Sequence, residues 1–592
     1  MPGTEKRLAC GALLLGFFPL PCFSADIKVG DATITLKATV TLGTALRAQD
    51  RDPDLMRAAN ATAIGAVGRA AGGQNSDDAN LNYARGDRVS TVLKGIGDIE
   101  FKYANYGARA RVKAWRDFTL DDRNVAWGNQ PSGYALNSPL SDEGFNPLAK
   151  FSNAALMDAY VYGTFAPWGQ PWLVQFGQQT IPWGAPASIA GGMQQINAHD
   201  GAARARPGWI ADELQIPVLA AFSRLSVTPH LNVEAFYQFR FAPSQMPGCG
   251  TFYAYVDYVA DGCDKVFVGA GNDRASLAGG VFGKRAPDIE SSGGQYGLGL
   301  TYLAEGLGRF GAYFASVHSR RFSLGVVKSL RLAPLPPLIP GDPGGANVQY
   351  LVEYPENVRI FTLNFQTRMP DNATFFAELT YQPNQMLRFN ATDLLNAFAS
   401  NVAPTPLRAD ATAVAPGGAF HGYDRFHVTQ FNLGGSKPLR GVLGAAQLTL
   451  GAEAAVKHVD QLPDPAIRRY GRSDLFGLGP VNNACAGTAA QCSTAGYVTS
   501  ASWGYRLRAG LVYPNVFSGV SLTPSLLFGH DVKGWSYDDV FSEKRKAAVF
   551  GLRADYQKRY FAEVSWTSIW GGTYNLARDR DSLVAVAGIS FQ

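Results

Sequence analysis

Apolar and polar residues alternate along many segments of this chain, and a period of two residues is typical of β-strands that have one apolar face. In the segment 31–48, apolar residues or alanine occupy every second position from Ile34 to Leu42, and threonine or lysine stands between them. The last segment, 583–592, alternates in the same way. An unpaired edge on this strand would be a hazard in water and would not be tolerated in lipid. We therefore expect the last strand to pair with the first one and close a barrel.

The alternation predicts about 18 strands, within a range of about 16 to 20. Short and long connections alternate strictly between them, which is the pattern of an outer-membrane barrel with short periplasmic turns and long extracellular loops. The predicted strands span 31–48, 89–103, 108–118, 154–165, 172–180, 214–226, 230–241, 295–304, 309–319, 357–367, 374–382, 425–434, 445–458, 497–513, 519–529, 546–557, 560–569 and 583–592.

This pattern predicts an all-β fold, a transmembrane antiparallel β-barrel in the bacterial outer membrane. Apolar side chains would face the lipid, and polar side chains would face a wet lumen. A β-sandwich has the same alternation with its apolar face turned inward, so the rhythm of the connections is what favours the barrel. Aromatic residues near the strand ends are expected at the two membrane interfaces: Trp115, Trp172, Tyr381, Tyr513, Trp566 and Trp570.

Residues 1–25 predict a cleaved signal peptide, which would direct export. A basic pair precedes the short apolar stretch 8–20, and the small residues Ser24 and Ala25 follow it. The alternative, a retained membrane anchor, would need a longer apolar stretch. We expect residues 26–592 to form the barrel.

Composition limits the classes of partner. The 592 residues carry a formal net charge of only +5, which is too little on so large a protein to predict nucleic-acid binding. The seven histidines are scattered without a metal-binding or triad spacing, so we expect neither an enzyme nor a cofactor. The expected partners are outer-membrane lipid and lipopolysaccharide, a small-molecule substrate, and a periplasmic or inner-membrane transport component.

The cysteines outside the predicted signal peptide form two local pairs. Cys249 is near Cys263, and Cys485 is near Cys492, each pair in a segment between predicted strands. In an exported protein such pairs predict loop disulfides. A four-cysteine metal site is the weaker alternative, because neither pair has C-x-x-C spacing.

Short motifs along the chain resemble a known family. They are Asn75 to Tyr83, Trp183-Gly184, Gly191-Gly192, Cys249 to Phe252, Tyr354 to Asn357 and Tyr381 to Asn384. In this order they resemble the domain-of-unknown-function 1302 family of proteobacterial outer-membrane proteins, over nearly the whole mature chain. The resemblance implies an outer-membrane protein of about this length. It implies no established substrate and no catalytic residues.

Charged residues on the predicted lumenal faces are candidates for lining a pore. Arg109, Arg111 and Lys113 share one face of their strand, and contact with lipid would cost each of them about 2–4 kcal/mol near the midplane. Together with Arg506 and Arg508 they would form a basic ladder that attracts anions. The alternative is that lumenal carboxylates neutralise them. The remaining pore-lining candidates are Glu234, Arg240, Glu378, Arg553 and Asp555.

The long connection 181–213 is expected to fold into the lumen as a constriction. Its glycines permit close packing, and its charges would set selectivity. An ordinary external loop is the alternative. The candidate constriction residues are Gly191, Gly192, Asn197, Asp200, Arg204 and Arg206.

The segment 49–87 is a second candidate for an in-folded loop. Its alanine-rich stretch 55–71 favours a helix that would plug or cap the lumen. A weak calcium-loop pattern lies further on, but Tyr83 stands where such a loop has glycine. Asx-turns explain this pattern more simply. The residues in question are Asp77, Asp78, Asn80 and Asn82.

We expect a channel for facilitated diffusion or uptake of a small hydrophobic or anionic substrate. A hydrophobic substrate is considered because the long connections contain the apolar segments 332–339 and 394–398. The alternatives are an occluded barrel that acts as a surface-binding protein, and the outer-membrane part of an export or uptake complex.

Overall fold

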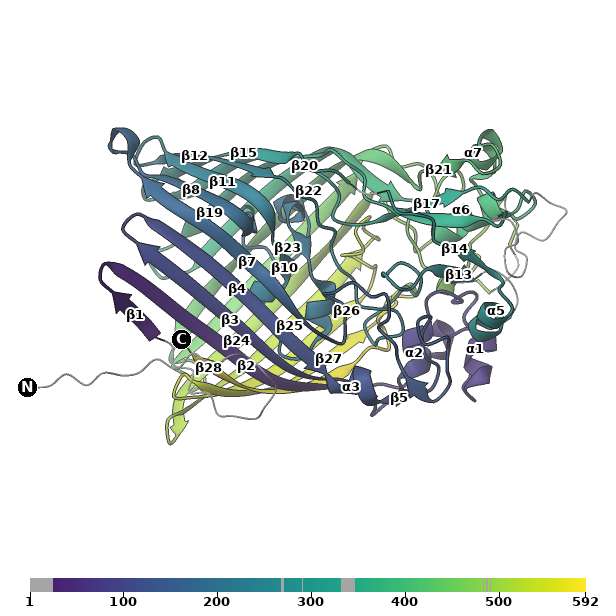
Figure 1. Cartoon of the computed structure of the whole chain (residues 1–592), viewed down its shortest axis with the longest axis horizontal. Coiled ribbons are helices and arrows are strands. Elements are labelled where there is room, and N and C mark those ends of the chain that lie inside the picture. Colours follow the sequence, from purple (N-terminus) through teal and green to yellow (C-terminus); the bar gives the residue numbers. More distant parts are fainter. Residues whose placement is uncertain are drawn as a thin grey trace, which may run out of the picture.

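The principal structure is one large antiparallel sheet. The computed structural model describes residues 25–267, 271–289, 291–331, 346–482, 484–485, 488–489 and 491–591. Residues 1–24 of the predicted signal peptide and the apolar loop segment 332–339 lie outside these described residues. The sheet contains 19 strands, and 18 of them form a closed ring (Figure 1).

The ring closes between the first long strand and the last one. β28 (Ser582–Phe591) pairs antiparallel with β2 (Ala32–Arg47), from Ala38 opposite Phe591 to Arg47 opposite Ser582. The extra strand, β1 (Ala25–Val29), pairs with the start of β2 and lies beyond the end of β28. The predicted 18-stranded closed barrel is therefore confirmed, and both edges of β28 are paired.

Each remaining strand of the ring pairs antiparallel with the ring strands that precede and follow it in the sequence. These strands are β3 (Arg88–Tyr103), β4 (Tyr106–Asp117), β7 (Ser152–Phe165), β8 (Trp172–Gln179), β11 (Val218–Ser226), β12 (Leu231–Gln238), β15 (Gln295–Ala304), β16 (Gly308–Val317), β19 (Val358–Arg368), β20 (Thr374–Arg388), β22 (Tyr423–Arg440), β23 (Gln447–Val459), β24 (Ala501–Phe517), β25 (Val520–Lys533), β26 (Lys546–Tyr556) and β27 (Tyr560–Trp570).

Some strand boundaries differ from the predicted ones for a physical reason. β11 begins at Val218 rather than at 214, because Gln215 and Ile216 pair with residues 198–199 instead of with the wall. β22 continues to Arg440, into the predicted turn 435–444, because its partner β23 pairs with it up to that residue.

The outer face of the ring is apolar. On β15, Tyr296, Leu298 and Leu300 are about half exposed, whereas Gln295 and Thr301 are buried on the inner face. This orientation is the reverse of a soluble sandwich, and so extended an apolar surface is compatible only with lipid. The chain is thus a bacterial outer-membrane barrel.

Not every aromatic residue follows the predicted girdle. Trp115 is buried on the inner face of β4, where the guanidinium of Arg206 lies 4.1 Å from its ring centroid. The girdle prediction is wrong for this residue, because the inward parity of β4 continues through it to Asp117.

The two ends of the barrel differ strongly (Figure 1). At one end, short hairpin turns connect the strands. At the other end, long loops with short elements form a cap. No helix in the described part of the chain is long and apolar enough to cross a membrane. The short elements of the long connections, in the cap and inside the ring, are α1 (Ala58–Ala63), α2 (Asp78–Asn82), α3 (Phe118–Asp122), α4 (Gly201–Ala205), α5 (Asp273–Ala278), α6 (Ala391–Ala399), α7 (Arg408–Ala413), β5 (Asn124–Val125), β6 (Ser138–Pro139), β9 (Ala198–His199), β10 (Gln215–Ile216), β13 (Lys265–Phe267), β14 (Phe282–Lys284), β17 (Ser323–Val327), β18 (Gln349–Glu353) and β21 (Ala419–Phe420).

The cap has its own apolar core and covalent cross-links. Leu394 and Phe398 of α6 are buried in this core, so the apolar face of that helix packs against other loops. Both predicted disulfides are present, Cys249–Cys263 and Cys485–Cys492.

The segment 49–87 lies in the cap with α1 and α2, not between the walls (Figure 1). Of the predicted helix 55–71, only α1 and the 3-10 turn that ends at Leu55 are helical.

Candidate functional site

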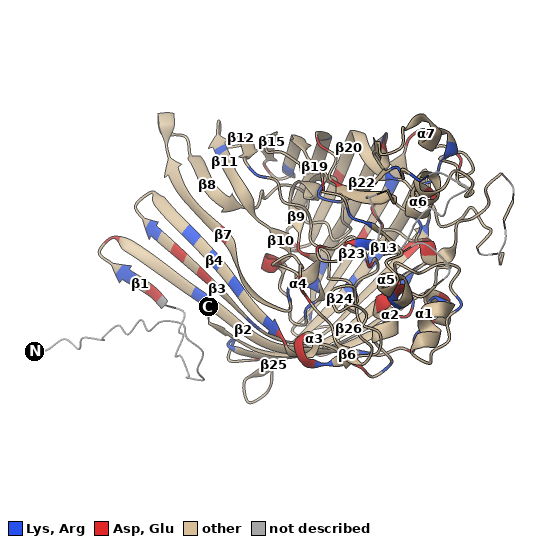
Figure 2. Ribbon diagram, turned by 45° about the vertical axis from the view of Figure 1, so that its right-hand side comes forward, with Lys and Arg blue, Asp and Glu red and all other residues tan. Residues whose placement is uncertain are grey.

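The connection from β8 to β11, residues 180–217 and here called the inner loop, lies inside the ring of strands. Its elements α4, β9 and β10 are seen between the walls in Figure 2. Three wall glutamates hold its first half. Trp183 Nε1 donates to Glu234 at 2.6 Å, the Ala185 N–H to Glu378 at 2.7 Å, and the Ser188 N–H to Glu453 at 2.7 Å.

The second half of the inner loop is held by the opposite wall. Lys113 of β4 forms a fully buried ion pair with Asp200 at 2.7 Å. Lys94 of β3 forms a second buried pair with Glu213. Together with the three glutamates, these contacts fix the inner loop across the lumen.

Two glycines permit the close approach of the inner loop to the wall. Gly191 has φ 126°, and a Cβ atom on it would lie 2.1 Å from Gln430 Oε1 of β22. Gly192 has φ 58°, and a Cβ atom there would lie 2.6 Å from Glu378 Oε1. These positive φ values and short distances favour glycine at both positions.

The other constriction candidates have different environments. Asn197 clamps the loop onto itself, since its side chain both donates to and accepts from the backbone of Ile181. Asp200 pairs with Lys113 and caps α4 by accepting from the Ala203 N–H at 2.8 Å. Arg206 is buried and donates to the Leu148 carbonyl. Arg204 is exposed to the cavity described below and forms no ion pair with a described residue.

The row Arg109, Arg111 and Lys113 points into the barrel, where carboxylates neutralise it. Arg109 and Arg111 share Asp98, at 2.5 and 2.8 Å, and Arg111 also pairs with Asp212 of the inner loop at 2.9 Å. This geometry corresponds to the neutralised alternative rather than to a free basic ladder.

The remaining pore-lining candidates are spread over the barrel. Arg506 pairs with Asp531 at 2.8 Å, whereas Arg508 is exposed and has no ion pair among the described residues. Arg553 pairs with Asp555 at 3.0 Å near the hairpin end. Arg240 lies beyond the end of β12 on the loop side, so it is not on the strand wall. Glu234 and Glu378, as described above, hold the inner loop.

A cavity of about 1470 Å³ lies between the inner loop, the cap and the wall of β25 to β28. Of the residues that the structure describes, ten arginines line it and only three acidic residues, Asp474, Asp539 and Glu563. The arginines are Arg57, Arg204, Arg206, Arg320, Arg321, Arg388, Arg472, Arg545, Arg553 and Arg580. Aromatic side chains also line the cavity, among them Phe322, Phe389, Trp535, Phe541 and Phe561. The cavity is therefore both basic and partly apolar.

Two of these arginines share one carboxylate, and Arg320 has no carboxylate partner among the described residues. Arg321 and Arg388 both pair with Asp539, at 2.5 and 2.7 Å. Arg320 is bonded only to neutral oxygens of the inner loop, β12 and the following residues, including the Ile196 carbonyl at 2.9 Å. Burial lowers the pKa of Arg320 to about 9, so it still carries its charge at neutral pH.

Sequence reasoning missed Arg320, Arg321 and Arg388. Arg320 and Arg321 follow the end of β16, and Arg388 is the last residue of β20. The only local signal is their position at the loop end of a wall strand. Nothing in the sequence shows that two separate segments bring them to one cavity.

The sequence profile of a protein family of unknown function, DUF1302, matches residues 6–591. The chain belongs to this family. The resemblance seen in the short motifs is thereby confirmed for nearly the whole chain. No curated protein sequence is significantly similar to it.

Solved outer-membrane proteins are distantly similar to the DUF1302 barrel. OccAB1 of Acinetobacter baumannii has 9% sequence identity and a TM-score of 0.40, with 94% of this chain and 95% of that chain covered. OpdK of Pseudomonas aeruginosa, solved with vanillate, has 10% identity and a TM-score of 0.37, with 94% and 97% covered. A BenF-like porin from Pseudomonas fluorescens Pf-5 has 8% identity and a TM-score of 0.40, with 94% and 97% covered. The barrel assignment rests on the strand pairing itself.

Proposed function

We propose that this DUF1302 protein is an outer-membrane channel for the uptake of a small organic anion that has an apolar part. The observation that carries the proposal is the excess of arginine over acidic residues around a cavity of about 1470 Å³ with aromatic side chains in its lining. Guanidinium groups bind carboxylates through paired hydrogen bonds, and they stack on aromatic faces. A cavity of this composition concentrates anions and disfavours cations.

The positions of the arginines suggest a path for the substrate through the barrel. Arg321 and Arg388 lie at the loop end and share Asp539, so a substrate carboxylate can compete with Asp539 for two guanidiniums. Arg204 follows on the inner loop, and Arg553 lies on β26 near the hairpin end. A substrate would pass along the wall of β25 to β27, which the cavity separates from the inner loop, and the inner loop would be the constriction.

One observation favours the alternative of an occluded barrel. The inner loop is fixed on one wall by two buried ion pairs and on the opposite wall by hydrogen bonds to three glutamates, and the cap covers the loop end of the barrel. Such a protein would bind its ligand at the surface without passing it. A periplasmic or inner-membrane partner also stays a prediction.

The decisive experiment compares three solutes of similar size and different charge. Refolded mature protein is placed in liposomes, and the uptake of benzoate, benzamide and benzylamine is measured together with the reversal potential in a salt gradient. We expect benzoate to enter fastest and the pore to prefer anions. Equal rates for the three solutes would contradict the proposal, and no uptake by folded protein would favour the occluded barrel.

A matched pair of variants tests the arginines. The double variant Arg321→Gln/Arg388→Gln is expected to lower the preference for benzoate by about tenfold or more, since a hydrogen bond to a charged group contributes about 1.5–3 kcal/mol. Arg359→Gln is the control, because Arg359 is exposed and lies outside the cavity lining. An equal effect of the control would mean that the cavity arginines do not select the substrate.

A further inference from the structure

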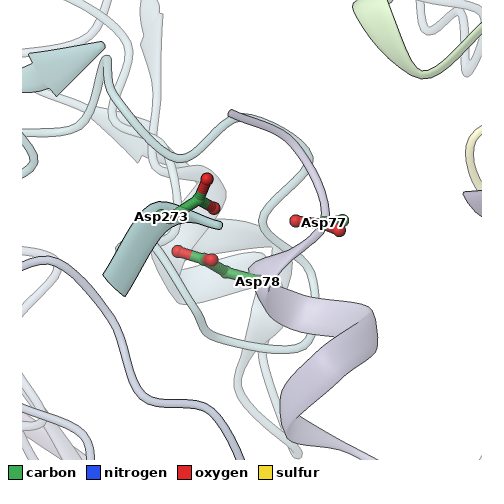
Figure 3. A group of neighbouring side chains, drawn as sticks. All are labelled: Asp77, Asp78 and Asp273. Atoms are coloured by element: carbon green, nitrogen blue, oxygen red, sulfur yellow. The ribbon is translucent and has the colours of Figure 1, made fainter. Parts of the chain in front are cut away.

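Three aspartates from two distant segments meet in the extracellular cap. Asp77 directly precedes α2, Asp78 begins α2, and Asp273 begins α5. Each offers a carboxylate oxygen, and these oxygens all lie within 4.8 Å of one another (Figure 3). All three side chains are fully buried. We call them the aspartate cluster.

The hydrogen bonds of the cluster come from neutral donors and leave one oxygen unused. Asn60 Nδ2 bridges Asp77 Oδ1 and Asp273 Oδ2, at 3.0 and 2.7 Å. Asp78 accepts from Trp127 Nε1 at 2.9 Å and from the Tyr134 hydroxyl at 3.3 Å. Asp273 Oδ1 accepts no hydrogen bond from any described residue, although the side chain is fully buried within the cluster.

A fourth buried carboxylate lies against the cluster. Asp257 Oδ2 accepts from the Asp78 N–H at 3.2 Å, and its Oδ1 likewise has no partner among the described residues. No lysine or arginine of the described chain lies within ion-pair distance of any of the four. The guanidiniums of Arg57 and Arg580 act only from a longer range, on Asp273 and Asp257 respectively.

Several negative charges in a buried site are energetically unfavourable. An isolated buried carboxylate is strongly disfavoured unless it is paired, protonated or bound to a metal. The unused oxygens of Asp273 and Asp257 point to a missing positive partner.

We propose that the aspartate cluster binds a calcium ion. Calcium takes oxygen ligands at about 2.3–2.6 Å, so oxygens on opposite sides of one ion lie close to the spacing seen here. A ligand set of carboxylates without histidine or cysteine favours calcium or magnesium over zinc. Magnesium keeps several of its waters, and a buried all-carboxylate group favours calcium.

This site is not the loop that the sequence pattern indicated. Asn80 accepts from Arg47 at 3.1 Å, and Asn82 accepts from the Trp127 and Gly128 N–H groups, so both side chains are directed away from the cluster. Asn80 and Asn82 lie on other faces of α2 than Asp78, and Asp273, from a distant segment, supplies the third carboxylate instead. Asp77 and Asp78 therefore belong to the proposed site, and Asn80 and Asn82 do not.

The position of the site indicates a structural role for the ion. It would tie the segment 49–87 to the loop 239–294, and both contribute lining to the cavity, for example Asn75 and Tyr255. The ion would stabilise the roof of the cavity. This inference does not rest on the proposed transport function.

The test uses refolded full-length mature protein in detergent, free of lipopolysaccharide. Calcium binding is measured by calorimetric titration, and thermal unfolding is followed with calcium chloride and with EDTA. We expect one saturable site and a higher unfolding temperature with calcium than with EDTA. No saturable heat and no calcium-dependent shift in the unfolding temperature would overturn the proposal and indicate protonated carboxylates.

Variants locate the site. Asp273→Asn keeps the shape of the side chain and is expected to weaken calcium binding by about tenfold or more, since affinity depends on the number of charged ligands. Asp264→Asn is the control, because Asp264 is an exposed acid of the same loop. Unchanged calcium affinity in Asp273→Asn would overturn the assignment. If this variant does not fold, the wild-type titration with calcium and EDTA still decides.

Discussion

The two sides of the barrel interior use charged residues differently. Along β3, β4, β12, β20 and β23, here called the anchored side, charges meet partners on the inner loop, as in Lys113 with Asp200 and Glu453 with Ser188. Along β25 to β27, the cavity separates the wall from the inner loop, and Arg553 lines this cavity while it pairs with Asp555. A charge on a lumenal face therefore anchors structure on one side and is available to a solute on the other.

The difference comes from partners rather than from residue type. Where the inner loop touches the wall, every removed charge leaves an opposite charge or a backbone group buried without a partner. Where the cavity intervenes, water or a solute replaces a lost partner at little cost to the fold. Variants on the two sides are therefore expected to affect different properties, stability on one side and selectivity on the other.

The largest effect is expected from Lys113→Met on the anchored side. It would leave Asp200 buried and unpaired, which costs about 3–5 kcal/mol when one partner of a buried pair is removed. The measurement is the urea midpoint of the refolded barrel. Arg116→Met on the same strand is the control, because its ion pairs are half exposed. Equal midpoints for the two variants would remove the distinction between anchored and open sides.

Replacing the close-contact glycine should give an intermediate effect. Gly191→Ala combines a φ of 126° with a contact of 2.1 Å to Gln430, and such backbone strain costs about 1–3 kcal/mol. Gly510→Ala on β24 is the matched control, since no atom lies within 4 Å of its added Cβ. Urea unfolding and single-channel conductance of both variants would be compared. A stable Gly191→Ala protein with unchanged conductance would show that the inner loop is not fixed at this point.

The smallest effect on stability is expected on the open side. Arg204→Gln should change the free energy of unfolding by less than about 0.5 kcal/mol, as is usual for an exposed residue. The same variant should reduce the anion preference measured by reversal potential. Arg111→Gln is the comparison, because Arg111 is paired with Asp98 and Asp212 and should lose stability instead. A loss of stability in Arg204→Gln together with a loss of anion preference in Arg111→Gln would contradict this assignment of the two sides.

The wall of the barrel could be predicted well because its signal is local. The alternation along β2 and β28 and the short turns identify the strands, and lipid on the outside enforces the pattern residue by residue. The cysteines near one another in sequence likewise predicted their own disulfides. Errors appear where the wall meets the inner loop, as at Trp115, whose ring is covered by Arg206.

The interior could be predicted much less. The sequence placed Arg109, Arg111 and Lys113 on one face, but it left open whether carboxylates neutralise them. Asp98, Asp200 and Asp212, which do so, come from another strand and from the inner loop. The cavity arginines and the aspartate cluster had no local signal that named their neighbours.

The sequence by itself determined a closed outer-membrane barrel of 18 strands with long loops at one end. Its period-two pattern is set by contact with lipid, which each strand experiences independently of the others. Only the tertiary structure decided which lumenal charges are paired, which arginines share one cavity, and how Asp77, Asp78 and Asp273 come together. The physical reason is that electrostatic partners act over a few ångströms in space, and the loops bring them there from distant parts of the chain.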